Sequence, residues 1–359
     1  MHERLGATLT SFAGWLMPLR YGSETAEHHA VRRAAGLFDL SHMGEITVSG
    51  PGAGAALDYA LTGRLSSLTP GRARYTMMCA EDGGVLDDLI VYRLGAEEFL
   101  VVANAANTAV VDAQLRRRAA GHDARIADRT GEYALIAVQG PNAARILGPL
   151  VSADLATLRY YAGHWGTVAG RRSWVARTGY TGEDGFEVFC RPDDAEHVWT
   201  ALASAGAPAG LVPAGLAARD TLRLEAGMPL YGNELGPDVT PHEAGQGWVV
   251  KFDKPGDFVG AAALAERAEA RPRRVLAALR LASRRIPRHG YAVLAGDREC
   301  GAVTSGAYSP TLGVPIAMAY LDPDVAAGPP EEGLAVDIRG RAESAELTEL
   351  PFYRRRLRS

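Results

Sequence analysis

The sequence contains almost no lysine: Lys251 and Lys254 are the only two, and all other basic side chains apart from histidine are arginines. These arginines are spread along the whole chain and do not gather into a basic patch. The formal net charge is only −4 over 359 residues. Nucleic acids and anionic membranes attract proteins through concentrated positive charge, so we expect neither as a partner.

Cysteines are equally scarce. Cys79, Cys190 and Cys300 lie far apart and form no C-x-x-C pair, so we expect no disulfide framework and no metal site. No apolar run reaches the length of a membrane span. The segment from Met1 to Trp15 lacks the charged-then-apolar order of a signal peptide. We therefore expect a cytoplasmic protein.

The length exceeds that of a typical single core and predicts two or three domains. The charged segment 266–274, which includes Arg271-Pro272-Arg273-Arg274, is typical of a linker. After it, short β-type segments separated by glycine and proline turns predict a small β-barrel or sandwich. These segments are 275–281, 291–294, 300–304, 315–320 and 335–338.

Before residue 266 the pattern is mixed. It predicts helices over 22–35, 55–61, 107–120 and 213–227 and strands over 44–48, 85–94, 98–102, 134–138, 174–177 and 187–189. The strands at 85–94 and 98–102 are separated by Gly95-Ala96 and are expected to form a hairpin.

Two adjacent aspartates, Asp87 and Asp88, interrupt the apolar strand that begins at Val85. Because side chains alternate faces along a strand, only one of them can point into a given pocket. Asp88 shares its face with Leu86 and Ile90 and would be partly desolvated, a setting that tunes an acid or base. The pattern fits equally well a turn aspartate followed by one at a sheet edge.

A second polar cluster spans residues 177–187, where three glycines in seven residues can bring backbone close to a ligand. Glu187 follows this loop and is a candidate acceptor for a heteroaromatic edge, although glycine-acidic loops are also common on surfaces. A third cluster places Arg219 and Arg223 one helical turn apart. Ion pairs with Asp220 and Glu225 are the alternative interpretation of that pattern.

Two dipeptides that contain histidine offer weaker signals. Ser41-His42 suggests a nucleophile and its base, but neighbours on an extended chain point apart. His28-His29 lacks the spacing of metal ligands. We expect surface or capping roles for all four.

Taken in order, segments along essentially the whole chain resemble the T-protein family of the glycine cleavage system. The segments are Phe12-Ala13-Gly14-Trp15, Glu27-His28-His29-Ala30-Val31-Arg32, Phe38-Asp39-Leu40-Ser41-His42-Met43-Gly44, Gly83-Gly84-Val85-Leu86-Asp87-Asp88-Leu89, Val138-Gln139-Gly140-Pro141, Thr178-Gly179-Tyr180-Thr181-Gly182-Glu183-Asp184-Gly185, Ala218-Arg219-Asp220-Thr221-Leu222-Arg223, Leu230-Tyr231-Gly232, Ser309-Pro310-Thr311-Leu312-Gly313 and Pro351-Phe352-Tyr353.

The resemblance implies an α+β fold of three domains arranged like a cloverleaf, with tetrahydrofolate in a central channel. Residues 1–265 would form the folate-binding region of two interleaved α+β domains, and residues 272–359 a C-terminal β-barrel. The implied enzyme is an aminomethyltransferase that moves the methylene of an aminomethyl group from the lipoyl arm of H-protein to tetrahydrofolate. The products are methylenetetrahydrofolate, ammonia and dihydrolipoyl H-protein. We expect a monomer.

The resemblance also implies roles for individual residues. Asp88 would face the folate and act as its acid or base, and Glu187 would accept the paired N–H edge of the pterin. Arg219 would hold a carboxylate or other polar groups of the cofactor.

Further cofactor contacts follow from the same resemblance. Tyr75 and Asn104 would flank the pterin, and Ile90 would pack on it. Tyr353 and Arg354 would reach the channel from the C-terminal domain.

Two other functions fit the same scaffold. One is a folate-dependent demethylase acting on a small sulfonium or methylamine. The other is the folate-binding protein of iron–sulfur cluster assembly, whose motif Lys-Gly-Cys-Tyr-x-Gly-Gln-Glu matches none of the three cysteines. Oxidase and dehydrogenase relatives carry a fused flavin domain, for which 359 residues leave no room.

Overall fold

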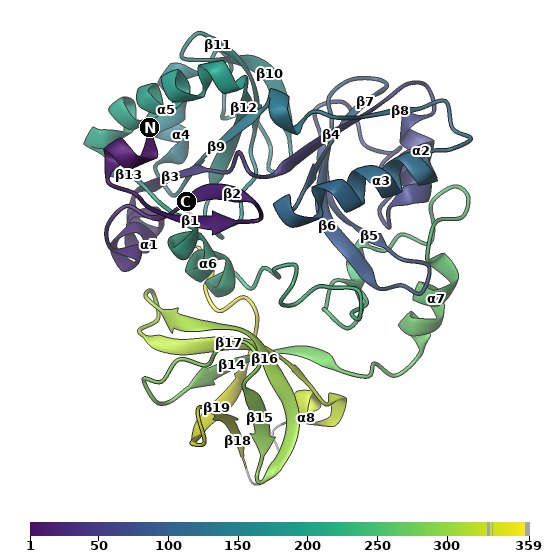
Figure 1. Cartoon of the computed structure of the whole chain (residues 1–359), viewed down its shortest axis with the longest axis vertical. Helices are drawn as coiled ribbons and strands as arrows, with labels where there is room; N and C mark the ends of the chain where they lie inside the picture. Colours follow the sequence, from purple (N-terminus) through teal and green to yellow (C-terminus); the bar gives the residue numbers. More distant parts are fainter. Residues whose placement is uncertain (329–330, 332, 356–359) are drawn as a thin grey trace. The chain divides into compact units, whose positions relative to one another are not determined.

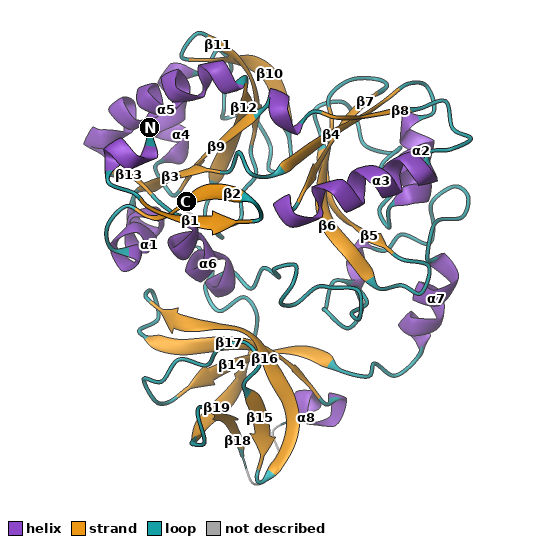
Figure 2. Cartoon of the chain, in the orientation of Figure 1, coloured by secondary structure: helices purple, strands orange, loops and turns teal. Residues whose placement is uncertain are grey.

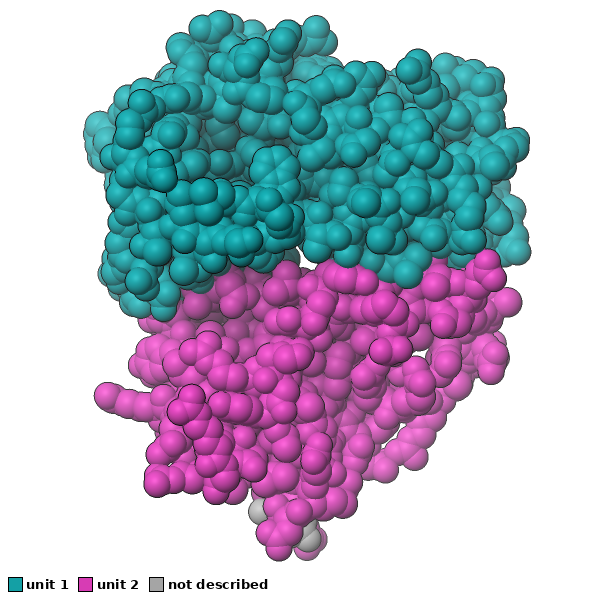
Figure 3. Space-filling model, in the orientation of Figure 1, with its two compact units in different colours: residues 1–78, 86–219, 253–259 teal, residues 79–85, 220–252, 260–359 magenta. Residues whose placement is uncertain are grey.

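The computed structural model describes residues 1–328, 331 and 333–355 and divides into two compact units (Figures 1 and 3). Unit 1, teal in Figure 3, comprises residues 1–78, 86–219 and 253–259, and unit 2, magenta, comprises residues 79–85, 220–252 and 260–359. The division cuts through β5 (Ala73–Cys79) and α6 (Leu216–Glu225). The units are therefore not simply consecutive stretches of chain.

Unit 1 contains a six-stranded sheet with the order β10-β11-β12-β9-β3-β13 (Figure 2). Neighbouring strands are antiparallel except β13 and β3, which are parallel. The strands are β3 (Ala35–Asp39), β9 (Ala134–Gln139), β10 (Gly163–Val168), β11 (Arg171–Ala176), β12 (Gly185–Cys190) and β13 (Leu211–Pro213). The helices that accompany this sheet are α1 (Glu24–Arg33), α4 (Ala143–Leu147) and α5 (Pro192–Gly206).

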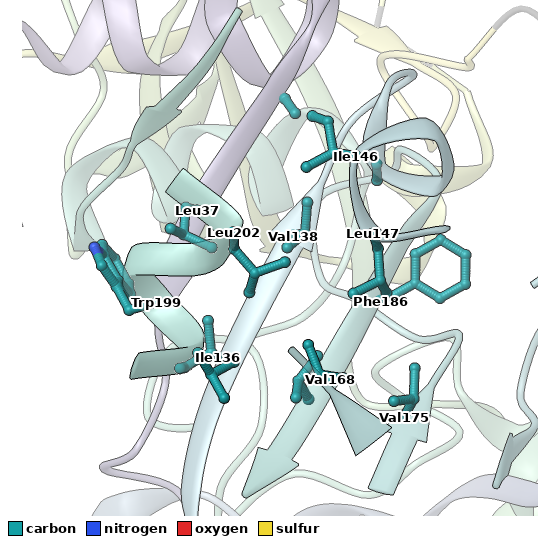
Figure 4. Close-up of a cluster of buried hydrophobic side chains, with 14 of the residues drawn as sticks. Leu37, Ile136, Val138, Ile146, Leu147, Val168, Val175, Phe186, Trp199 and Leu202 are labelled. Atoms are coloured by element: carbon teal, nitrogen blue, oxygen red, sulfur yellow. The ribbon is translucent and has the colours of Figure 1, made fainter. Parts of the chain in front are cut away.

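One face of this sheet carries the core that α4 and α5 cover (Figure 4). Phe186 and Val188 of β12 lie in that core with Trp199 and Leu202 of α5. Because side chains alternate along a strand, Glu187 points to the opposite face. That face is the one turned away from α4 and α5.

A five-stranded sheet with the order β5-β6-β7-β4-β8 forms the rest of the core of unit 1. Its further strands are β4 (Gly44–Ser49), β6 (Val85–Arg93), β7 (Glu98–Ala103) and β8 (Arg125–Asp128). Leu89 and Val91 of β6 pack with side chains of α2 (Ala53–Ala60) and α3 (Thr108–Arg118). The expected pairing of the strands at 85–94 and 98–102 is confirmed, since β6 and β7 are antiparallel neighbours.

The remaining strands of unit 1 were not expected from the sequence. β1 (Thr8–Phe12) and β2 (Trp15–Arg20) form a hairpin. Its turn places Ala13 and Gly14 at φ 49° and 83°, the left-handed pair that a two-residue hairpin requires.

The described residues also contain short 3-10 helices: η1 (His2–Leu5), η2 (Ala105–Asn107), η3 (Thr130–Glu132), η4 (Gly148–Leu150), η5 (Ala207–Ala209) and η6 (Gly247–Val249).

Unit 2 contains a closed antiparallel barrel with the order β14-β17-β16-β15-β18-β19. Its strands are β14 (Val275–Leu281), β15 (Ala292–Ala295), β16 (Arg298–Ser309), β17 (Val314–Leu321), β18 (Leu334–Asp337) and β19 (Ala342–Thr348), with α8 (Pro323–Ala327) between β17 and β18. The sheets and helices of unit 1 and this barrel confirm the α+β class and the barrel predicted from the sequence.

The linker prediction over 266–274 is partly wrong, because α7 (Ala261–Glu269) extends through its first four residues. α7 begins with three alanines, Ala261 to Ala263, which strongly favour a helix. The charged residues that follow them do not prevent the helix from continuing. None of the helices in residues 1–328, 331 and 333–355 has both the length and the apolar character needed to cross a bilayer.

Candidate functional site

The face of β6 that is turned away from α2 and α3 carries Asp88, Ile90 and Tyr92. Asp87 points to the opposite, helix-covered face and is 0% exposed, whereas Asp88 and Ile90 are half-buried. The expected division of the two aspartates between faces is therefore what the structure shows. Asp88 is the carboxylate that solvent and a ligand can reach.

Asp88 is held at both oxygens. The Tyr75 hydroxyl donates to Oδ2 at 3.0 Å, and the Asn104 side-chain amide donates to Oδ1 at 2.8 Å. Burial raises the pKa of Tyr75 well above its ordinary value, and the charge of Asp88 raises it further, so the phenol keeps its proton as a donor. The structure thus brings together three residues that the sequence proposed separately.

Asp87 is part of the same cluster, which the sequence did not reveal. Asn104 donates to it from its backbone N–H at 3.0 Å and from its side chain at 2.9 Å. Asn107 adds a third hydrogen bond at 2.7 Å. Burial, followed by the charge of Asp88, raises the pKa of Asp87 to about 7.

Glu187 lies on β12, on the face of the six-stranded sheet opposite its helix-packed core, and is 8% exposed. The hydroxyls of Thr178 and Tyr92 both donate to its Oε2, the second at 3.1 Å. Its Oε1 receives no hydrogen bond from any of the residues that the structure describes. That oxygen is the acceptor left for a ligand.

Two tyrosines that the sequence did not indicate lie near these carboxylates. Tyr92 is fully buried, shares a strand face with Asp88 and donates to Glu187. The pKa of Tyr161 is raised by burial and then by the charges of Tyr160, Glu187 and Asp88, which places its hydroxyl near both carboxylates. Asp88 on one sheet of unit 1 and Glu187 on the other are therefore taken to border a candidate ligand pocket.

The backbone of Tyr161 supports a role in this pocket. Its φ of 56° lies in the left-handed region, which is rare for a bulky side chain and concentrates at functional sites. The period-two pattern of β6 could have indicated Tyr92. No local signal indicates Tyr161, because its neighbours in the sequence do not specify a positive φ.

Arg219 lies over the ring of Tyr180, with its guanidinium carbon 4.6 Å from the ring centroid. Such stacking holds the cation in place. Arg223, one turn further along α6, is 1% exposed and pairs with Asp220 at 2.8 Å and Glu234 at 2.9 Å. The ion-pair interpretation is therefore the correct one for Arg223.

The expectation of surface or capping roles for the histidine pairs is wrong for two members. His28 is 0% exposed and His42 is 4% exposed. Burial, and then the charge of Arg219, lowers the pKa of His42 to about 4. His42 is thus a neutral side chain in the core beside Arg219, a position set by tertiary packing.

The glycine loop at 178–185 closes around the side chain of Gln139, which is 2% exposed. Gln139 donates to the backbone oxygen of Thr178 at 3.0 Å and accepts from the Thr181 hydroxyl at 3.0 Å. A Cβ at Gly179 or Gly185 would lie 2.0 or 2.3 Å from the Gln139 amide. The glycines are therefore needed for close packing on a fixed amide.

The same loop is anchored from α1. Arg32, which is 8% exposed, donates to the backbone oxygen of Thr181 at 2.6 Å and to Glu183 at 3.0 Å. Together with Gln139 it fixes the segment that carries Thr178 and Tyr180.

We expect Gly179→Ala to lower the free energy of unfolding by about 1–3 kcal/mol, the usual cost of overpacking. The new methyl group must displace an amide that two hydrogen bonds hold. Thermal unfolding would measure this effect. Gly148→Ala is the matched control, since no atom lies within 4 Å of a Cβ there. Equal unfolding temperatures for both variants would contradict the packing argument.

Tyr353 and Arg354 belong to unit 2, whereas the other six predicted site residues belong to unit 1. The backbone N–H of Tyr353 donates to the backbone oxygen of Glu225 at 2.8 Å. Arg354 is exposed.

The chain is similar to known proteins over nearly its whole length. The family model described as GCVT N-terminal domain matches residues 1–254, and the one described as Glycine cleavage T-protein C-terminal barrel domain matches residues 274–354. Proteins named aminomethyltransferase from Saccharopolyspora erythraea and Streptomyces coelicolor are 64% and 62% identical, each over 99% of this chain and 96% of the relative.

A solved structure gives the same result. The crystal structure of glycine cleavage system aminomethyltransferase T from Bartonella henselae matches with a TM-score of 0.91 and 36% identity, over 99% of this chain and 96% of that one.

Proposed function

We infer the roles of the site residues from one premise: the chain belongs to the glycine cleavage T-protein family and is an aminomethyltransferase of that system. We propose that tetrahydrofolate is its co-substrate and that the lipoyl arm of H-protein delivers the aminomethyl group. In the overall reaction the carbon–sulfur and carbon–nitrogen bonds of S–CH₂–NH₂ break, and two carbon–nitrogen bonds to the folate form. The two folate N–H protons end on the thiol and on ammonia.

The pocket in unit 1 fits a reduced pterin by the chemistry of its acceptors. A pterin presents an amino group and an adjacent ring N–H as paired donors, which suit a carboxylate. Glu187 offers Oε1 as an open acceptor, while Thr178 and Tyr92 hold Oε2. Glu187 would therefore bind the donor edge mainly through Oε1.

Asp88 would hold and polarise the folate nitrogens that take up the methylene, and would accept the proton that one of them loses. Its position supports this role, because Tyr75 and Asn104 restrain both oxygens while the residue stays half-exposed. Two restrained carboxylates, one on each sheet of unit 1, are the observation on which the proposal rests most.

The remaining residues would complete the pocket. Ile90, on the same strand face as Asp88, would pack on the pterin, and the stacked Arg219 would bind polar groups of the folate. Tyr353 and Arg354 remain predictions from the family resemblance. We also propose a folate-binding region over 1–265, a barrel domain over 272–359, and a monomer in the cytoplasm.

Release of ammonia from aminomethyl-loaded H-protein, measured with and without tetrahydrofolate, tests this function. We expect rapid release that depends on the folate. If fully loaded H-protein releases no ammonia with this enzyme, the proposed partner is wrong. Folate-dependent demethylation of a small sulfonium or methylamine would then be the function to assay.

A further inference from the structure

Asp87 does not face the pocket, yet it is the most heavily hydrogen-bonded carboxylate beside it. It is 0% exposed and accepts three N–H donors, two from Asn104 and one from Asn107. Burying an ionisable group costs free energy unless its hydrogen bonds are made. The three donors meet that need and tie Asp87 to the segment between β7 and α3.

Asn104 connects Asp87 with Asp88. Its side-chain nitrogen lies 2.9 Å from Asp87 Oδ1 and 2.8 Å from Asp88 Oδ1. Both partners are acceptors, so the amide must present its NH₂ group to them. One amide group is therefore shared between the two carboxylates, and its position depends on both.

We propose that Asp87 is a positioning residue for aminomethyl transfer, which holds Asn104, and through it Asp88, and whose negative charge strengthens Asp88 as a base. This inference rests on the role proposed above for Asp88. Adjacent like charges disfavour one another, and each makes the other bind a proton more tightly. A carboxylate with greater affinity for protons is the better base for a weakly acidic folate N–H.

The other titratable groups around Asp87 and Asp88 support the proposed effect of the Asp87 charge on Asp88. The titratable side chains that face Asp88 in the described part of unit 1 include Tyr75 on β5 and Tyr161 ahead of β10. Burial raises the pKa of both phenols, so neither adds charge near neutral pH. Asp88 is the charged group that acts on Asp87. The coupling is therefore mainly between the two carboxyls.

Steady-state kinetics of Asp87→Asn test the proposal. We expect kcat to fall up to roughly a hundredfold, the effect of misplacing a catalytic group, with KM for tetrahydrofolate nearly unchanged. In the wild type kcat should rise near pH 7, where Asp87 ionises and its charge begins to act on Asp88, and this rise should be absent from the variant. Asp112→Asn, on α3, is the control and should behave as wild type.

A purely structural role predicts a different result. Asp87→Asn would then unfold at a lower temperature, but the folded fraction would keep the wild-type kcat and pH profile, and that outcome would overturn the inference. Failure of the proposed function is distinguishable, because wild type itself would then show no folate-dependent release.

A second measurement keeps the proposal testable if Asp87→Asn does not fold. In wild-type protein with carbon-13-labelled aspartate, one carboxyl resonance should titrate near pH 7, and in Asp88→Asn it should titrate at lower pH. If no aspartate titrates near neutrality, or if its titration is the same in Asp88→Asn, the two carboxyls are not coupled and the inference is wrong.

Discussion

Replacement of Asp88 by asparagine is expected to reduce folate-dependent ammonia release by at least roughly a hundredfold, the usual scale for losing an acid or base group. The fold should not change. Asparagine can keep its oxygen toward Asn104 and turn its amide toward Tyr75, whose hydroxyl can rotate and accept the hydrogen bond. The loss would then report proton transfer. Single-turnover release from loaded H-protein measures this step without product release.

Tyr75→Phe is the informative companion to this variant. It removes one hydrogen bond to Asp88 but leaves the carboxylate, so a smaller loss of roughly tenfold is expected, equivalent to about 1.4 kcal/mol. If Asp88→Asn releases ammonia at the wild-type rate, Asp88 is not the base. The Tyr75 variant should then have no effect on release either.

Replacement of Glu187 by glutamine should act on binding. A hydrogen bond to a charged group contributes about 1.5–3 kcal/mol, so KM for tetrahydrofolate should rise roughly ten- to a hundredfold while kcat changes less. Thr178 and Tyr92 donate to one oxygen of residue 187, so the glutamine oxygen would turn toward them. Its NH₂ group would then meet the donor edge of the pterin. A titration of tetrahydrofolate into the variant measures this effect directly.

Thr178→Val provides a graded comparison for Glu187→Gln. It removes one of the hydrogen bonds that orient Glu187 but keeps the charge and nearly the same volume, so KM should rise by a smaller factor. Glu132→Gln is the control for charge alone, since that residue is exposed. An unchanged KM in Glu187→Gln would mean that the pterin edge binds elsewhere in the pocket.

Much of the fold was predictable because its signals are local. The strand at 85–94, the hairpin partner at 98–102 and the five predicted barrel strands all show alternation or glycine and proline turns. The structure places a strand at each of them. Strand periodicity likewise placed Asp87 and Asp88 on opposite faces before any tertiary contact was known, but it was the family resemblance that singled out Asp88.

The missed elements have weak local signals. β13 has three residues, and it is defined by its parallel pairing with β3 far away in the sequence. The linker was predicted to begin at residue 266, which lies inside α7. The charged residues at 266–269 suggested a linker, although the alanine-rich start of α7 favours a helix. His42 was expected at the surface because nothing in Ser41-His42 shows that tertiary packing buries this side chain.

The sequence by itself determined the family, the fold class and the identity of the polar residues, because these depend on composition, periodicity and ordered motifs. Only the tertiary structure decided how those residues act on one another. Contacts between separate strands and loops determine that Asn104 is shared between Asp87 and Asp88 and that Tyr92 and Thr178 leave one oxygen of Glu187 open. They also determine that Tyr161 lies near both carboxylates. Hydrogen bonds and charge effects act over a few ångströms in space, and separation along the chain does not specify those distances.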